Sequence, residues 1–177
     1  MASKRTEGTR EARDAAYWDA IDEASELLQE GNHEQGLVEL KRVLGESPNN
    51  HYAYHLLGQA LWELGKLEPS RDAFRAAVLL APDFLGARVA LVHALRRTRD
   101  IEEAERQAQI ALDRFPGDGE AMHAHALVLA ARGKRRDARK KLEGYLRTKP
   151  EFEAATEARG VLEMLALGDD DEPLDVD

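Results

Sequence analysis

Residues 51–84 read HYAYHLLGQALWELGKLEPSRDAFRAAVLLAPDF, and this stretch decides the fold. Its first half repeats the three- and four-residue spacing of one helix face, at Tyr54, Leu57, Gly58, Leu61 and Leu64. Gly65 follows as a residue that ends helices. The second half has the same spacing, at Ser70, Ala73, Phe74, Ala77 and Leu80. Pro82 ends this second segment because it has no N–H to donate. The stretch therefore predicts two helices joined by a turn.

The pattern recurs along the chain with a period of 34 residues. Two columns keep this period throughout: Pro48, Pro82, Pro116 and Pro150, and Leu27, Leu61, Leu95 and Leu129. A glycine column keeps it at Gly31, Gly65 and Gly133, with Arg99 at the remaining place. Because separate residue types share one period, the sequence predicts a tandem repeat of two-helix units.

A helix–turn–helix period of this length resembles the tetratricopeptide repeat family. That family prefers small residues at repeat positions 8 and 20. Position 8 here holds Ala24, Gly58, Val92 and Ala126, and position 20 holds Gly36, Ser70, Ala104 and Ala138. The resemblance covers residues 17–152. It implies an all-α fold, a right-handed α-solenoid of about four repeats, and a role in binding other proteins.

The expected organisation follows from the repeat register. Residues 1–16 form a flexible segment that leads into a first helix over about residues 15–30. The four repeats occupy residues 17–50, 51–84, 85–118 and 119–152. Asp100 is the expected N-cap of the second helix of the third repeat. Residues 153–168 form a helix that covers the open end of the array, and residues 169–177 form a disordered acidic tail.

Composition excludes several functions. There are no cysteines, so disulfides, thiolate metal sites and a cysteine nucleophile are absent. No run of residues is apolar enough for a membrane span, and the N-terminal residues do not read as a secretory signal, so the cytoplasm is the expected location. The net charge of −9 disfavours nucleic acid. No catalytic motif, cofactor site or metal-ligand set occurs, so we do not expect an enzyme.

The resemblance also implies a binding groove. In the family, the first helix of each repeat lines a concave groove that holds a peptide or helix of a partner. The matching residues here are Trp18, Ile21, Asp22, Ser25, Tyr52, His55, Leu56, Gln59, Trp62, Val89, His93, Arg96, Arg97, His123 and Leu127. Both tryptophans of the chain belong to this set. The sequence therefore favours an adaptor or scaffold with an apolar groove and a polar rim.

Charge is distributed unevenly, which leaves other functions open. Residues 17–50 have eight acids and two bases, a net charge of −6, whereas residues 119–152 have four acids and nine bases, a net charge of +5. A basic patch is expected on the convex side, at Lys134, Arg135, Arg136, Arg139, Lys140 and Lys141. Three interpretations of this patch are open: a face that is only solvated, a surface that the acidic tail contacts, or a surface for head-to-tail contact in a self-assembling homo-oligomer. A secretion chaperone of the same repeat family is a further alternative.

Overall fold

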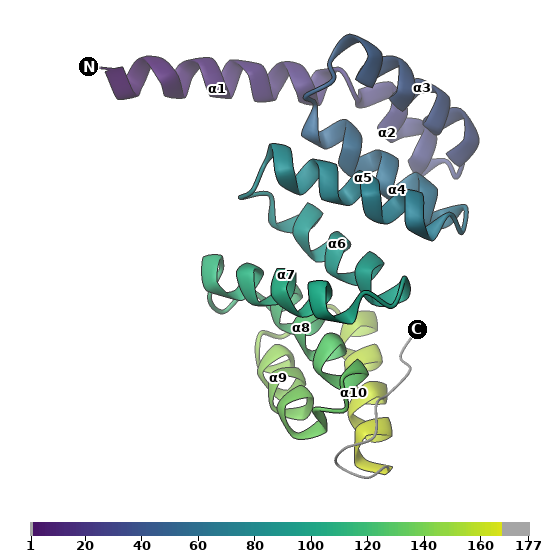
Figure 1. Cartoon of the computed structure of the whole chain (residues 1–177), viewed down its shortest axis with the longest axis vertical. Coiled ribbons are helices and arrows are strands. Elements are labelled where there is room, and N and C mark those ends of the chain that lie inside the picture. The colour runs from purple at the N-terminus through teal and green to yellow at the C-terminus, as the bar shows by residue number, and fades with distance from the viewer. Residues whose placement is uncertain (1, 168–177) are drawn as a thin grey trace. The chain divides into compact units, whose positions relative to one another are not determined.

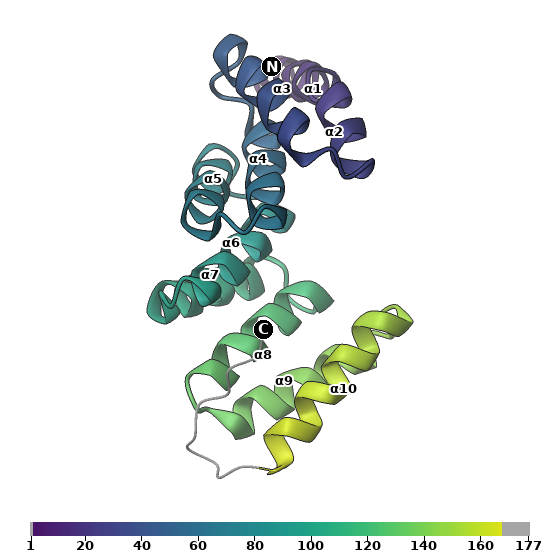
Figure 2. The same cartoon turned by 90° about the vertical axis from the view of Figure 1, so that its right-hand side faces the viewer.

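The computed structural model describes residues 2–167, which form ten α-helices and no strand (Figures 1 and 2). The chain divides into two compact units, residues 1–84 and residues 85–177. Unit 1 contains α1 (Ala2–Asp19), α2 (Asp22–Gln29), α3 (His33–Glu46), α4 (His51–Glu63) and α5 (Leu67–Leu80). Unit 2 contains α6 (Leu85–Arg97), α7 (Ile101–Arg114), α8 (Gly119–Ala131), α9 (Arg135–Arg147) and α10 (Phe152–Leu167). The predicted all-α fold class is confirmed.

In unit 1, consecutive helices pack as hairpins around small apolar cores. Helix α4 packs against both α3 and α5, and α2 packs against α3. One core joins α2, α3 and α4 through Ala24, Leu40, Val43 and Ala53, together with Ile21, which precedes α2. The α4–α5 contact depends on a close approach, because Gly58 of α4 faces the ring of Phe74 on α5.

In unit 2, α8 is the central helix. It packs against α6, α7 and α9, and its residues from Ala124 to Ala130 are all buried. Helix α10 lies along α9 (Figure 2) and places Val161 and Leu165 in a core shared with α8 and α9. This helix covers apolar surface of the last hairpin, as the sequence predicted for a terminal helix.

The glycine and leucine columns have one structural cause. Gly31, Gly65 and Gly133 adopt positive φ angles of 78°, 69° and 75° at the ends of α2, α4 and α8. The N–H after each glycine donates to the carbonyl of a leucine in the preceding turn, at 2.8–2.9 Å. Those leucines are Leu27, Leu61 and Leu129. Each pair closes its helix with the six-to-one bond of a Schellman motif, so the two columns are the two ends of one recurring turn.

Arg99 makes the same turn at the end of α6 without being a glycine. Its φ is 64°, and the next N–H, of Asp100, donates to Leu95 O at 2.9 Å. A residue with a side chain that adopts the left-handed conformation destabilises the folded state by about 1–2 kcal/mol. Glycine avoids this strain, but its unfolded state is more flexible, which offsets part of the gain in folding free energy. We therefore expect Arg99→Gly to stabilise unit 2 by about 0.5–1 kcal/mol, measured by urea unfolding with circular dichroism. The reverse change in unit 1, Gly65→Arg, should destabilise by a similar amount. A lower stability of Arg99→Gly would contradict this account.

The N-terminal region differs from the prediction. Residues 2–19 are helical where a flexible segment was expected, and the helix expected over residues 15–30 is divided into α1 and α2. At the break, Ile21 N donates to Trp18 O instead of Tyr17 O. The Tyr17 carbonyl accepts a hydrogen bond from the Asn50 side-chain amide at 2.9 Å. Asp22 and Glu23 then occupy the first turn of α2, where negative charge is favourable.

The expected N-cap at Asp100 is confirmed in its position but not in its side-chain hydrogen bond. Asp100 occupies the N-cap position of α7, but its side chain makes no capping hydrogen bond. Its N–H is used in closing α6, and its ψ of 62° departs from the extended backbone that caps usually have. Asp118, with a ψ of 131°, does cap α8, since its carboxylate accepts the Ala121 N–H at 2.9 Å. The tail at residues 169–177 and Gly168 lie outside the described residues.

Candidate functional site

Aromatic rings gather in unit 1 where α1 meets α4. The Trp18 side chain is 59% exposed, and its ring meets Tyr52 edge to face with centroids 5.2 Å apart. Tyr52 in turn contacts His51 at 4.0 Å and Phe84 at 5.5 Å. The complete aromatic cluster consists of Tyr17, Trp18, His51, Tyr52, His55, Phe74 and Phe84. The other rings of the cluster are buried or half-buried, so Trp18 is the member that offers its aromatic surface to solvent.

The other predicted groove residues of unit 1 have different environments. Asp22 and Gln59 are exposed, whereas Ser25, Leu56 and Trp62 are half-buried. Ile21 is 3% exposed and belongs to the core, because the break between α1 and α2 turns it toward α3. We define the first-helix surface of unit 1 as the remaining residues: Trp18, Asp22, Ser25, Tyr52, His55, Leu56, Gln59 and Trp62.

His55 is a neutral group in this surface. Its ring lies 5.6 Å from Phe74 and 4.9 Å from Phe84. Burial lowers the pKa of His55 to about 4, because the charged form would lose its hydration. The imidazole is therefore uncharged at neutral pH and acts there as an aromatic and hydrogen-bonding group.

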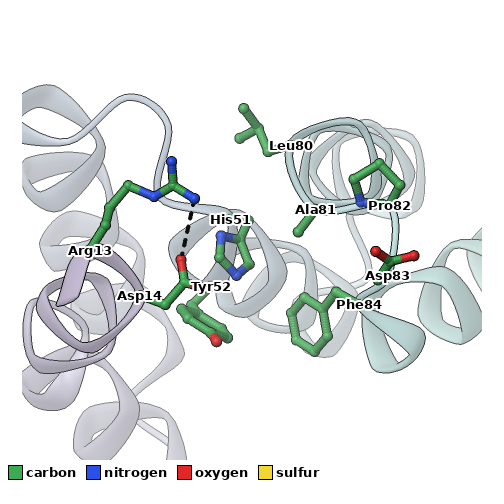
Figure 3. Close-up of a pocket in the computed structure, with 9 residues that line it drawn as sticks. All are labelled: Arg13, Asp14, His51, Tyr52, Leu80, Ala81, Pro82, Asp83 and Phe84. Carbon is green, nitrogen blue, oxygen red and sulfur yellow. Dashed lines mark ion pairs between the residues drawn. The ribbon is translucent and has the colours of Figure 1, made fainter. Parts of the chain in front are cut away.

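A pocket of about 560 Å³ opens beside the aromatic cluster (Figure 3). Three segments far apart in the sequence form it: α1, the start of α4, and the end of α5 with the loop that follows. The lining residues are Arg13, Asp14, His51, Tyr52, Leu80, Ala81, Pro82, Asp83 and Phe84. Arg13 and Asp14, consecutive residues of α1, form an ion pair at one end of the pocket at 3.6 Å. The family pattern did not point to this pocket.

One signal in the sequence could have indicated the pocket. Asn50 and Asp118, in the 34-residue register, cap α4 and α8 with their side chains. The residue at the equivalent place before α6 is Phe84, which cannot accept a capping hydrogen bond. An aromatic residue at a capping place indicates that the side chain is used elsewhere, and here it joins the aromatic cluster.

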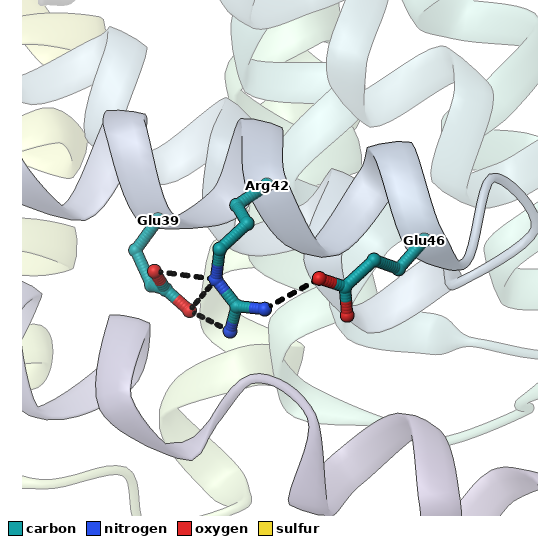
Figure 4. A network of polar contacts seen from close by, with 3 residues as sticks. All are labelled: Glu39, Arg42 and Glu46. Carbon is teal, nitrogen blue, oxygen red and sulfur yellow. Dashed lines mark hydrogen bonds and ion pairs between the residues drawn. The ribbon is translucent and has the colours of Figure 1, made fainter.

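The acidic charge of unit 1 is partly neutralised on α3. Arg42 lies between Glu39 and Glu46 and pairs with both (Figure 4). Its hydrogen bonds to Glu39 lower the pKa of Glu39 and raise the pKa of Arg42. The network is exposed, so it contributes little to stability. Because Arg42 pairs with Glu39 and Glu46, the negative charge of residues 17–50 comes mainly from the other acidic residues of this range.

In unit 2, the predicted groove residues form a smaller and more polar first-helix surface on α6 and α8. His93 and His123 have ring centroids 6.4 Å apart, and His123 stacks on Tyr145 at 4.9 Å. Burial lowers the pKa of His93 to about 4, with Arg96 and His123 as further causes, and burial also lowers the pKa of His123. Both imidazoles are thus neutral at neutral pH.

Several residues predicted to line this surface are instead buried. Val89, Arg96 and Leu127 are each less than a tenth exposed, and Leu127 belongs to the core with α9 and α10. Arg97 is half-buried. The first-helix surface of unit 2 therefore consists of His93, Arg97 and His123, with Arg96 behind them.

The basic patch on α9 keeps most of its predicted members. Arg136, Arg139 and Lys140 are exposed and Lys141 is half-buried. Lys134 pairs with Glu105 of α7 at 2.7 Å, and this hydrogen bond is the main cause of a lowered pKa of Glu105. Arg135 is 3% exposed and its guanidinium donates to Met164 O at 3.4 Å. Arg135 therefore connects α9 to α10 and is not part of the exposed patch.

Two further observations concern the described part of the chain. Within residues 2–167, no three His, Asp or Glu side chains converge as metal ligands. No helix in the same range is both long enough and apolar enough to cross a lipid bilayer.

Two family models match this chain. Models of the tetratricopeptide repeat match residues 27–83 and 89–122. The class is that of helical-repeat scaffolds for protein interactions, whose members are typically non-enzymatic adaptors. The chain belongs to the tetratricopeptide repeat family. No curated protein sequence matches it significantly.

Solved structures share this fold. MamA is 20% identical with a TM-score of 0.67, and 86% of each chain is covered. PilF of Pseudomonas aeruginosa is 21% identical with a TM-score of 0.73, covering 86% of this chain and 70% of its own. YrrB, described as a repeat protein with an unusual peptide-binding site, is 20% identical with a TM-score of 0.66, covering 91% of this chain and 82% of its own. At these identities the likeness concerns the fold.

Proposed function

We propose that this protein is an adaptor that holds a peptide or helix of a partner protein against the first-helix surface of unit 1. The observation that carries this proposal is the exposed Trp18 ring seated on Tyr52. Exposed, rigid aromatic side chains supply much of the binding energy at protein interfaces. Leu56 and His55 extend the same apolar surface along α4.

The first-helix surface of unit 2 is a second, more polar surface, which we propose separately as a contact for a partner protein. Arg97 carries a positive charge, and His93 and His123 are neutral groups that can donate or accept hydrogen bonds. This chemistry suits a carboxylate or a backbone carbonyl of the partner. YrrB is described as having a peptide-binding site, which agrees with an adaptor role for the fold.

The test is capture of partners from a lysate of the native cells by the tagged protein, followed by identification and measured affinity for the purified partner. Trp18→Ala should weaken that affinity by about tenfold or more, since an interface tryptophan is often worth 1.4 kcal/mol or more. Phe152→Ala is the matched control, because Phe152 is an even more exposed aromatic residue that lies outside both first-helix surfaces. Equal affinity of wild type and Trp18→Ala for every partner would refute the proposal.

Self-assembly is the second candidate, favoured by the exposed cations of α9. Arg139 and Lys140 face solvent, and residues 17–50 of another copy carry a net charge of −6. Opposite charges on two surfaces of one chain favour a head-to-tail contact between copies. A sedimentation coefficient that does not change with salt concentration would exclude it.

A further inference from the structure

We propose that the pocket beside the aromatic cluster binds one cationic side chain, arginine or lysine, from a basic segment of a partner protein. This site lies at the ends of α4 and α5 and is separate from the surface assigned above, although Tyr52 borders both. All lining residues belong to unit 1.

Three rings supply the wall of the pocket. His51 and Tyr52 have centroids 4.0 Å apart, and Phe84 lies 5.8 Å from the first and 5.5 Å from the second. The faces of tyrosine and phenylalanine rings, here Tyr52 and Phe84, attract cations that come within about 6 Å. An aromatic wall alone would equally suit an apolar side chain, so the choice of ligand depends on the charges around it.

A carboxylate stands on each side of the rings, and the one on α1 has Arg13 as its neighbour. Asp14 of α1 and Asp83 of the loop after α5 stand at opposite ends of the pocket (Figure 3). The surrounding sequence has the same sign, since residues 17–50 carry −6 and residues 51–84 carry −1. A basic partner segment is therefore attracted at long range and paired at short range.

The remaining lining suits the stem of a long cationic side chain. Leu80, Ala81 and Pro82 line the pocket on the side of α5 and the loop that follows it. Arginine and lysine bury their methylene groups on apolar surface while their charged heads keep polar partners. A shorter or anionic side chain would leave these residues uncovered or meet carboxylates of its own sign.

Arg13 is the cation that already stands beside Asp14 in the lining of the pocket. Its guanidinium lies 3.6 Å from the carboxylate of Asp14, the next residue of α1, while its side chain remains 57% exposed. Such a long contact to a largely exposed arginine contributes little to stability, so an incoming cation can displace Arg13. Removing Arg13 should consequently strengthen binding of the basic probe.

The experiment uses fluorescein-labelled peptides Ac-Gly-Ser-Ala-X-Ala-Ser-Gly in which X is arginine, lysine, citrulline or glutamate, titrated with the full chain at low salt. Citrulline has the shape of arginine without its charge. Arginine and lysine peptides should bind at least about fivefold more tightly than the citrulline peptide, and the glutamate peptide should bind most weakly. Asp83→Asn should lower arginine-peptide affinity about fivefold, and Arg13→Ala should raise it.

Glu68→Gln is the matched control, because it removes one exposed carboxylate at the opposite end of α5. It should leave the affinity for the arginine peptide nearly unchanged. Equal binding of arginine and citrulline peptides would overturn the inference, as would no measurable binding of either cationic peptide or equal effects of Asp83→Asn and Glu68→Gln. None of these variants changes Trp18, so the result is independent of the test of the first-helix surface.

Discussion

Replacing Asn50 with alanine is expected to destabilise unit 1 by about 2–4 kcal/mol. The Asn50 side chain is fully buried and uses both ends of its amide. Its oxygen accepts the Ala53 N–H at 3.1 Å and caps α4, while its NH₂ group donates to Tyr17 O at 2.9 Å. Alanine would remove a helix cap and would also leave the Tyr17 carbonyl, freed by the break after α1, without this donor. The two losses should add because they affect different helices.

Tryptophan fluorescence is the measurement for this prediction. Trp18 and Trp62 are the only tryptophans of the chain, and both belong to unit 1. Urea unfolding followed by fluorescence therefore reports on unit 1, whereas circular dichroism reports on all helices. Asn49→Ala, at the exposed neighbouring position, should leave the midpoint unchanged. Asp118→Ala, which loses a cap alone, should cost unit 2 about 1 kcal/mol.

Asn50→Asp distinguishes the two functions of the amide. The carboxylate can still accept the Ala53 N–H, but it cannot donate to Tyr17 O and would bring a charge into a buried site. We expect Asn50→Asp to be destabilising at neutral pH and to recover part of its stability at acidic pH, where a protonated carboxyl can donate again. An unchanged fluorescence midpoint for Asn50→Ala would show that Asn50 does not connect α1 to α4.

Replacing Gly58 with valine is expected to destabilise unit 1 by about 3 kcal/mol. A Cβ atom on Gly58 would lie 2.5 Å from both Cδ1 and Cε1 of Phe74, and valine would add two more carbons toward the same ring. Phe74 is buried on α5 and cannot swing into solvent without opening a cavity. Ser70 further fixes the spacing of the helices, because its buried hydroxyl donates to Gly58 O at 2.7 Å.

The same unfolding measurement tests the Gly58 prediction. Gly45→Val is the control, because a Cβ atom at Gly45 of α3 would meet no atom within 4 Å. It should be neutral or slightly stabilising, since valine is a somewhat better helix former than glycine. Phe74→Leu should be destabilising alone but should recover part of the loss when combined with Gly58→Val. Purely additive effects of the two changes would contradict direct contact between these positions.

Individual residues show how far the sequence alone predicts this structure. The family resemblance implies a small residue at repeat position 8, and Gly58 at that position lies against the ring of Phe74, where a Cβ atom would not fit. The Schellman turns are equally local, since each joins residues within one turn of helix. Ile21, in contrast, matches the groove pattern yet is buried, because the chain breaks just before α2. Nothing in the sequence near Ile21 marks that break, since it contains neither glycine nor proline.

The sequence by itself determined the helices from α3 onward, the period that pairs them, and the small residues where paired helices approach. These features depend on backbone hydrogen bonds and side-chain spacing within a few residues, so they can be predicted from the order of residues in the sequence. The tertiary structure alone decided the end of α1, since Asn50 satisfies a carbonyl 33 residues away. It also decided the pocket, which exists only where α1, α4 and the loop after α5 meet. Such features depend on which distant groups become neighbours once the helices pack, and local spacing does not encode that.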